Sequence, residues 1–311
     1  MLLPSQRWYF VAIGLILFSI LLLGNSFLEP PYKPTFLTHT KPSVHPIWLI
    51  ATFSPASGFQ RRMMIRDTWQ KLYRNDSIFT SRFVISNPGD LWAPFIEAEN
   101  ATYGDLIMLP QLEETSHVAN TVKSVEFFKH ITSGTDRWAF VSKLDDDSYL
   151  DAHTFYETFL HPRLVLERAN SADVFPSAMN RTIVGRTLHR DKWTYPGGQF
   201  YTMSWDMVVL IADLHRANPI SDEHEDVLVG RLLHEADEEW HHIDLPSSIA
   251  FDYEADEVLD GGSAFAKKNA NLDGWSHAVG PGAINPHKLR DDEDYLKVAA
   301  CFSKDGVMYP A

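Results

Sequence analysis

Basic residues are scarce in this chain, and they never gather into a cluster. The 311 residues include 27 Lys and Arg against 41 Asp and Glu, which gives a formal net charge of −14. Neither a run rich in Lys and Arg nor a periodic repeat is present. Because binding to a nucleic-acid backbone needs a basic surface, this composition argues against a nucleic-acid partner. The apolar fraction of 45% is ordinary for a globular protein with a hydrophobic core.

Cysteine is nearly absent as well, since Cys301 is the only one in the sequence. A single cysteine cannot form a disulfide within the chain, although a secretory compartment would permit one. The fold therefore has to depend on its hydrophobic core. A length of 311 residues is sufficient for one or two domains.

Charge is missing altogether from residues 8–24, which read WYFVAIGLILFSILLLG. As a helix this run would be about 25 Å long, at the short end of the membrane-spanning range. Arg7 precedes the run and the next basic residue is Lys33, so the positive-inside rule predicts a cytosolic tail at 1–7 and a lumenal remainder. We predict an uncleaved signal anchor, with a cleaved signal peptide as the alternative.

A segment rich in proline, serine and threonine follows the anchor at 25–45. This composition is typical of an extended stem. N-glycosylation tripeptides begin at Asn75, Asn100 and Asn180 and agree with a secretory location. The globular, lumenal domain is predicted to occupy 46–311.

Apolar runs with strand character alternate with segments of helical spacing from residue 47 to residue 170. Strands are predicted at 47–53, 82–86, 105–109 and 138–144, and helices at 58–74, 115–132, 151–170, 204–217 and 223–235. This alternation is typical of an α/β fold with a mixed, mainly parallel sheet of Rossmann type, flanked by helices. In such sheets ligands bind beyond the carboxyl ends of the strands.

Three consecutive carboxylates stand at that edge, because Asp145, Asp146 and Asp147 follow the strand predicted at 138–144. A solvated turn is the ordinary explanation of such a run. A site for Mg²⁺ or Mn²⁺ is the functional one, since these ions prefer oxygen ligands and share them with phosphates. In an extended chain Asp145 and Asp147 lie on one side and Asp146 points away. The position favours a site for a nucleotide-diphosphate donor.

Six motifs follow one another along the chain: RRMMIRDTW at 61–69, YGDLIML at 103–109, NTVKSVEFF at 120–128, VSKLDDDSYL at 141–150, YPGGQFYTMSWD at 195–206 and EDVLVG at 225–230. In this order they resemble glycosyltransferase family 31, the β-1,3-galactosyltransferase family, in a short, fungal-like form. The resemblance extends from about 47 to 290. Phe200 departs from the family pattern, in which a glycine is usual, and the lumenal cysteines of animal members are missing here.

The resemblance implies a GT-A-like fold and an inverting, metal-dependent hexosyltransferase. The leading hypothesis is transfer of galactose from UDP-galactose to an acceptor hydroxyl in a β-1,3 linkage. Mn²⁺ or Mg²⁺ would be the cofactor, and the acceptor would be a glycan, a glycoprotein or a glycolipid. The protein is then expected to be a single-pass type II protein of the Golgi membrane, and a homodimer is allowed.

For the chemistry, the resemblance implies that Asp226 of EDVLVG is the general base that takes the proton from the acceptor hydroxyl. Glu225 is the second candidate. Both carboxylates would also be favourable as plain N-terminal charges of a helix, because they interact with its dipole. Gly198 is predicted to let a sugar approach the backbone closely.

Residues in the first half of the chain are predicted to contact the donor nucleotide. With the family match, Arg62 and Arg66 are predicted near the diphosphate or in the ordering of the aspartate loop, while a solvated basic face is the alternative. Thr52, Phe53 and Ser54 end the first strand, where this fold commonly receives the uracil. Asp145 and Asp146 complete the predicted nucleotide contacts.

The metal is predicted to bind Asp145 and Asp147 together with one late histidine. His287 is preferred because two basic residues follow it closely, and His277 is the second candidate. Imidazole nitrogen and carboxylate oxygen can both serve as ligands of a divalent cation.

Three other functions stay open at this point. The same fold with UDP-N-acetylglucosamine is the nearest, since few substitutions in a donor pocket separate the two sugars. A non-catalytic, glycan-binding or scaffolding protein is the second, and the intact aspartates argue against it. A metal-dependent phosphohydrolase is the third, but it would usually need ligands for two metals or a covalent nucleophile.

Overall fold

The computed structural model describes residues 47–166, 176–190, 192–253 and 276–308. The predicted tail, anchor and stem lie outside these ranges. Within the described ranges, no helix has both the length and the apolar character that crossing a membrane requires. The chain divides into two compact units, Met1–Val44 and His45–Ala311, and the second contains all the described residues.

A seven-stranded sheet lies at the centre of this second unit, in the order β3-β2-β1-β4-β8-β7-β9. Its strands are β1 (Trp48–Phe53), β2 (Phe79–Asn87), β3 (Leu106–Glu113), β4 (Phe140–Asp145), β7 (Thr182–Arg190), β8 (Trp193–Ser204) and β9 (His241–Asp244). β3, β2, β1 and β4 are parallel. β8 runs antiparallel to both β4 and β7, and β9 pairs in parallel with β7. The predicted mixed, mainly parallel sheet is confirmed.

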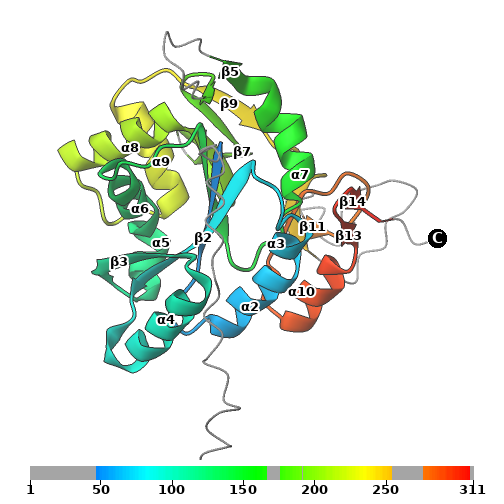
Figure 1. The fold of residues 1–311 in the computed structure, drawn as a ribbon. Helices are drawn as coiled ribbons and strands as arrows, with labels where there is room; N and C mark the ends of the chain where they lie inside the picture. Colours follow the sequence, from blue (N-terminus) through cyan, green and yellow to red (C-terminus); the bar gives the residue numbers. More distant parts are fainter. Residues whose placement is uncertain (1–46, 167–175, 191, 254–275, 309–311) are drawn as a thin grey trace, which may run out of the picture. The chain divides into compact units, whose positions relative to one another are not determined.

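Helices cover both faces of the sheet (Figure 1). They are α2 (Phe59–Asp67), α3 (Trp69–Leu72), α4 (Gly89–Tyr103), α5 (Ser116–Thr121), α6 (Lys123–Thr132), α7 (Ala152–Phe155), α8 (Trp205–Ala217), α9 (Glu225–Glu235) and α10 (Asp292–Ala299). In Figure 1, α6, α8 and α9 lie on one side of the central strands, and α2, α3, α7 and α10 on the other.

Strand β1 shows how the sequence produces these layers. Trp48 and Ile50 pack into the core that holds the α2 and α7 side chains, while Leu49 and Ala51 pack into the core of α6, α8 and α9. Successive side chains of a strand point to opposite faces, so a strand covered on both sides is apolar along nearly its whole length. This explains the run IWLIATF, in which Thr52 is the one polar residue.

Short strands complete the fold. β10 (Ala250–Tyr253) pairs in parallel with β11 (Ser276–His277) and β12 (Asn285–His287). Two hairpin-like pairs are β5 (Leu164–Leu166) with β6 (Pro176–Ala178) and β13 (Phe302–Ser303) with β14 (Gly306–Val307). The pairing of β10 with β12 brings a late segment of the chain to the site described below.

Within the described residues, which reach 166 here, the helix predicted at 151–170 is a regular α-helix only as far as Phe155. α7 ends at Phe155, a π-helical turn (Tyr156–Leu160) and a 3₁₀ turn (His161–Arg163) follow, and the chain then enters β5. Pro162, which follows the π-helical turn, has no N–H to continue the helical hydrogen bonds beyond it. The next residues, Leu-Val-Leu, pair with β6 instead.

Other predicted boundaries also move. The helix predicted at 58–74 breaks at Thr68, whose backbone is not helical, and the one at 115–132 divides into α5 and α6 at Val122. The strand predicted to stop at Pro110 continues to Glu113, with a shift of register opposite Ser86 and Asn87. Because proline cannot donate a hydrogen bond to the neighbouring strand, an irregularity at this point is expected.

Candidate active site

The triple Asp lies at the carboxyl end of β4, in the middle of the sheet. β4 ends at Asp145, and a hydrogen bond from Ser148 N to Asp145 O (3.1 Å) closes the turn that holds the next two aspartates. Asp145 and Asp147 lie together with His287, whereas Asp146 is not part of this cluster and faces the cavity beyond the end of β1. Their alternating positions in the chain thus send neighbouring carboxylates in different directions.

Asp145, Asp147 and His287 form a cluster that could hold a metal ion. One ligand atom from each lies within 4.8 Å of the others. His287 Nε2 is 3.3 Å from Asp147 Oδ1 and 3.8 Å from Asp145 Oδ2. Two carboxylates and an imidazole suit a divalent cation such as Mn²⁺ or Mg²⁺ that completes its coordination with phosphate or water.

His287 is brought to the aspartates by hydrogen bonds between two distant segments. Tyr149 N donates to Pro286 O and Leu289 N donates to Asp147 O, both at 2.9 Å. The side chain of Asn285 adds a hydrogen bond to Tyr149 O at 2.9 Å. The segment that carries His287 is therefore bound along the aspartate turn.

A third carboxylate, that of Asp252, orients His287 from the other side of the imidazole ring. His287 Nδ1 lies 2.8 Å from Asp252 Oδ1, and Lys288 Nζ lies 2.6 Å from Asp252 Oδ2. Burial alone would lower the pKa of His287, but the hydrogen bonds with Asp147 and Asp252 raise it to about 9. Because a metal binds neutral imidazole, cation binding at Nε2 would displace a proton.

Lys143 connects this cluster to a second pair of carboxylates at the start of α9. Its Nζ lies 2.6 Å from Asp145 Oδ1 and 2.8 Å from Glu225 Oε1, and it donates to Gly198 O. The ammonium is buried, which would lower its pKa, but Asp145 and Glu225 raise the pKa of Lys143 above its ordinary value. Lys143 thus stays charged between the two carboxylates.

Glu225 and Asp226 differ in their hydrogen-bond partners. Glu225 contacts Lys143 and accepts a hydrogen bond from Tyr201 Oη at 3.3 Å. Asp226 accepts from the backbone amides of Val227, at 2.8 Å, and of Gly198. Burial, and then the nearby charge of Glu225, raise the pKa of Asp226. A carboxylate with a raised pKa is better suited to accept a proton.

Gly198 is in close contact with both α9 carboxylates. A Cβ at this position would lie 2.8 Å from Glu225 Oε1 and 3.5 Å from the Asp226 side chain. The first distance is shorter than an ordinary contact, so a Cβ would require the Glu225 carboxylate, which pairs with Lys143, to shift. Glycine thus allows β8 to approach the start of α9 closely.

Two adjoining cavities meet at Asp145 and Lys143. The first, of about 330 Å³, contains the α9 carboxylates, and we call it the transfer cavity; its other charged residues are Arg186, Asp252, His287 and Lys288. The second, of about 420 Å³, lies beyond the carboxyl end of β1, and we call it the base cavity; it contains Phe53, Ser54, Pro55, Glu114, Lys123 and Asp146. Both cavities are also lined by Ala119 and Asn120.

Several residues predicted for the site lie away from both cavities. Arg62 is fully buried and pairs with Glu99 (2.6 Å) instead of facing a diphosphate; it also donates to the carbonyls of Pro55 (2.5 Å) and Ala56 (3.2 Å). Its guanidinium thus holds the loop that forms one wall of the base cavity. Thr52 is buried in the sheet, and the next residues, Phe53 and Ser54, reach the cavity.

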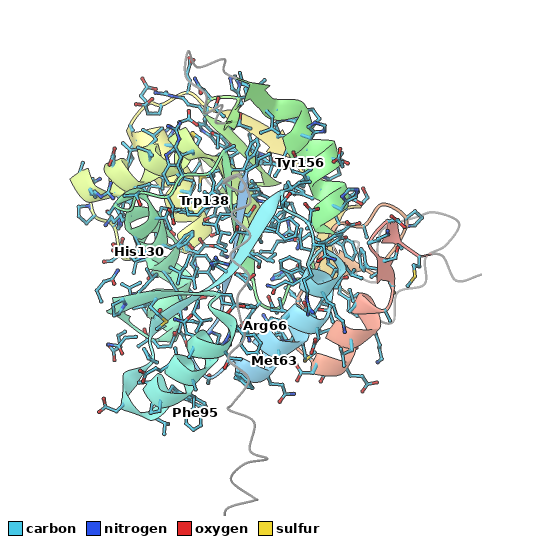
Figure 2. The ribbon with its side chains drawn as sticks, in the orientation of Figure 1. Met63, Arg66, Phe95, His130, Trp138 and Tyr156 are labelled. Carbon is cyan, nitrogen blue, oxygen red and sulfur yellow. The ribbon has the colours of Figure 1, made fainter. Side chains whose placement is uncertain are left out.

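Arg66 has a similar structural environment. Arg66 belongs to α2 (Figure 2), and its side chain forms ion pairs with Glu99 of α4 (2.7 Å) and with Asp105 (2.8 Å). The alternative of a solvated basic face is wrong for both arginines, since Arg66 is also buried. For His277 the structure describes only the backbone, on β11 beside Tyr253.

The sequence offered a signal for one of the residues that had no predicted role. Lys143 and Asp145 are two positions apart on a strand, so they share a face, and K-x-D could have been read as a pair. Asp252 and Arg186 gave no such signal, because they lie on strands β10 and β7, which the sequence pattern did not predict. Glu114 gave none because it lies on the connection from β3 to α5, whose position depends on the tertiary fold.

Comparison with known proteins agrees with this site. The sequence model of the family described as Galactosyltransferase matches residues 60–244, more than half of the chain, and this range includes the triple Asp and the α9 carboxylates. No curated protein matches the chain significantly.

Solved structures of glycosyltransferases give more remote matches. The galactosyltransferase LgtC, in complex with donor and acceptor sugar analogs, has 9% identity and a TM-score of 0.43, with 84% of this chain and 97% of that chain covered. A glycosyltransferase involved in the glycosylation of the major capsid of PBCV-1 has 10% identity and a TM-score of 0.43, with 82% and 100% covered. The mannosyltransferase PcManGT from Pyrobaculum calidifontis, with GDP-Man and Mn²⁺, has 13% identity and a TM-score of 0.36, with 66% and 56% covered.

The family model matches in the region where the six motifs resemble glycosyltransferase family 31. This chain therefore belongs to the galactosyltransferase family.

Proposed function

We propose that this glycosyltransferase is an inverting, metal-dependent enzyme that transfers galactose from UDP-galactose to a hydroxyl of an acceptor glycan, in a β-1,3 linkage. The observation that carries the proposal is the pair of adjoining cavities. A cluster fit for a cation lies at their junction, and a half-buried carboxylate with a raised pKa lies in the transfer cavity.

The donor would lie across the junction, with its nucleotide in the base cavity and its sugar in the transfer cavity. Asp145, Asp147 and His287 would hold the cation, which supplies positive charge for the diphosphate as it departs. Lys288 (48% exposed) and Arg290 (79% exposed), both beside this cluster, add further positive charge on the side open to solvent. Mn²⁺ is the proposed ion and Mg²⁺ the alternative.

Asp226 is the proposed general base. The acceptor oxygen forms a bond to the anomeric carbon, the bond from that carbon to the diphosphate breaks, and the proton of the acceptor hydroxyl passes to Asp226. A single displacement of this kind inverts the anomeric configuration. Glu225 is less suited to the role, because Lys143 and Tyr201 already occupy it.

Galactose and the β-1,3 linkage are proposed on the strength of the family. UDP-N-acetylglucosamine is the alternative donor, since few substitutions in a donor pocket separate the two sugars. A glycan on a glycoprotein or glycolipid is the proposed acceptor. We also propose that the run at 8–24 anchors the enzyme in the Golgi membrane as a type II protein.

The proposed function is tested by measuring UDP release from a panel of UDP-sugars. The full-length chain, purified in detergent, is incubated with Mn²⁺ and each donor, with and without β-galactoside acceptors. We expect acceptor-dependent UDP release from UDP-galactose that EDTA abolishes and Mn²⁺ restores. Release from UDP-N-acetylglucosamine instead would correct the donor. Absence of release from every donor and acceptor, together with absence of metal-dependent UDP binding, would contradict the proposal.

A further inference from the structure

An ion pair between Lys123 and Glu114 lies in the base cavity, and the proposed transfer chemistry makes no use of it. Lys123 Nζ lies 3.4 Å from Glu114 Oε1 and donates to Ser54 O at 3.2 Å. Lys123 begins α6 and belongs to NTVKSVEFF, one of the six motifs. Glu114 precedes α5 on the connection from β3.

Lys123 is an unusual residue for a cavity wall because its side chain is only 3% exposed. A buried ammonium is costly unless it is paired and hydrogen-bonded. Burial lowers the pKa of Lys123, and the carboxylate of Glu114 opposes this shift. The ammonium has three N–H donors, and within the described part of the chain Ser54 and Glu114 engage two of them. One donor remains for a ligand.

Glu114 has a complementary acceptor to spare. Its side chain is 23% exposed, and one of its oxygens, Oε2, is buried without a hydrogen-bond partner among the residues that the structure describes. A buried acceptor that lacks a partner is unfavourable, so an N–H group of a ligand would stabilise it. An ionised carboxylate only accepts hydrogen bonds, whereas an ammonium only donates them.

We propose that Glu114 and Lys123 select the base of the donor nucleotide. The carboxylate accepts the N3–H of uracil, and the ammonium donates to the neighbouring carbonyl oxygen at C4. Cytosine has an acceptor at N3 and an amino donor at C4. Its N3 would therefore face the Glu114 carboxylate, which is also an acceptor, and its amino group would face the Lys123 ammonium, which is also a donor. This selectivity rests on the proposed function, because that function places the nucleotide in the base cavity.

The wild-type chain provides the first test. Calorimetry in Mn²⁺ compares UDP with CDP, which keeps the size of the ring constant, and with N3-methyl-UDP, which lacks only the N3–H. We expect UDP to bind ~10-fold or more tightly than either, because a site built for an N–H group rejects analogues without it. Equal affinity for UDP and N3-methyl-UDP would overturn the assignment.

Two variants identify the residues responsible. In Glu114→Gln the amide can rotate to accept or to donate, so the preference for UDP over CDP should fall to within about threefold. Lys123→Met should weaken UDP binding ~10-fold. Glu113→Gln, which changes an exposed carboxylate one residue away, should keep the wild-type preference. Thermal unfolding of each variant verifies that it is folded. If Lys123→Met does not fold, the nucleotide preference of Glu114→Gln alone tests the assignment.

The outcomes separate this proposal from the one on which it rests. Tight UDP binding with a preference that Glu114→Gln leaves intact would overturn the selection by Glu114 and Lys123, but not the transferase. Binding of none of the three nucleotides by the wild-type chain would contradict the proposed function itself.

Discussion

The two cavities that meet at Lys143 are built by different halves of the sheet. The base cavity lies beyond the carboxyl end of parallel β1 and beside the end of β4, where doubly wound folds usually bind ligands. The transfer cavity is formed by the antiparallel strands β7 and β8, by the start of α9 and by β10 and β12. In the parallel half, the cavity lies where the strand topology alone creates a binding site. In the antiparallel half, the carboxylates and the histidine of the cavity are brought together by contacts between segments that are distant in the sequence.

The two cavities also differ in how their charged side chains are arranged. In the base cavity, Lys123 and Glu114 pair with each other, so their charges are offset locally. In the transfer cavity, Glu225 and Asp226 follow one another, and the first raises the pKa of the second. We conclude that one cavity is suited to binding and the other to proton transfer. If this division is correct, variants in the two cavities should have separable effects.

The largest effect is expected from Asp226→Asn. Removal of the general base should lower kcat of transfer by ~10²–10⁴-fold, because the acceptor hydroxyl then loses its proton acceptor. The rate of UDP release in the presence of acceptor measures this. Asp222→Asn, which changes an exposed carboxylate (87% exposed) just before α9, is the matched control and should keep the wild-type rate. Full activity of Asp226→Asn would remove Asp226 from the mechanism.

Asp147→Asn should act through the metal. Loss of a charged ligand should weaken the binding of UDP in Mn²⁺ by ~100-fold, comparable to the upper end of what the loss of an outer-shell partner costs. Calorimetric titration of UDP, with Mn²⁺ and then with EDTA, measures the effect. The exposed Asp136→Asn serves as control. Wild-type affinity in Asp147→Asn would show that the cluster is not the cation site.

Gly198→Ala should affect the transfer cavity alone, because its new Cβ would contact Glu225 Oε1 at 2.8 Å. Displacement of the α9 carboxylates should lower kcat/KM for the acceptor ~10- to 100-fold. Gly197→Ala places its Cβ at ordinary contact distances of 3.5 Å and should be nearly silent. Equal rates for the two variants would argue against a close fit between β8 and α9.

The smallest effect is a shift of the pH profile. Since the pKa of Asp226 is raised, first by burial and then by Glu225, kcat/KM should fall as the pH decreases through that pKa and the base becomes protonated. Glu225→Gln removes the neighbouring negative charge, so this acid limb should move to lower pH. An acid limb that stays in place, or moves to higher pH, would contradict the assignment of that limb to Asp226.

The same division decides how much the sequence could predict. Strands β1, β2, β3 and β4 were predicted near their observed positions, because buried parallel strands appear as short apolar runs. Strands β7 and β8 were not predicted, because glycine, proline and polar residues interrupt their apolar pattern. β9 to β12 are too short for any periodic signal.

The residues of the candidate site were predictable to the same extent as the strands that carry them. Asp145, Asp147 and Asp226 could be predicted because motifs and strand ends mark them. Asp252 and Glu114 could not, since they join the site through the pairing of β10 with β12 and through the connection after β3. The prediction for Arg62 placed its charge near the diphosphate or in the ordering of the aspartate loop, but no local pattern could show that this charge would be buried and paired with Glu99 of α4.

The most direct test of the division is the affinity of Asp226→Asn for UDP in the presence of Mn²⁺, measured by calorimetry beside the wild-type chain. We predict equal affinities within about twofold, although the variant has lost transfer, because Asp226 lies in the transfer cavity and outside the base cavity and the cation cluster. Loss of UDP binding together with loss of transfer would contradict the account, since Asp226 would then belong to the binding of the nucleotide.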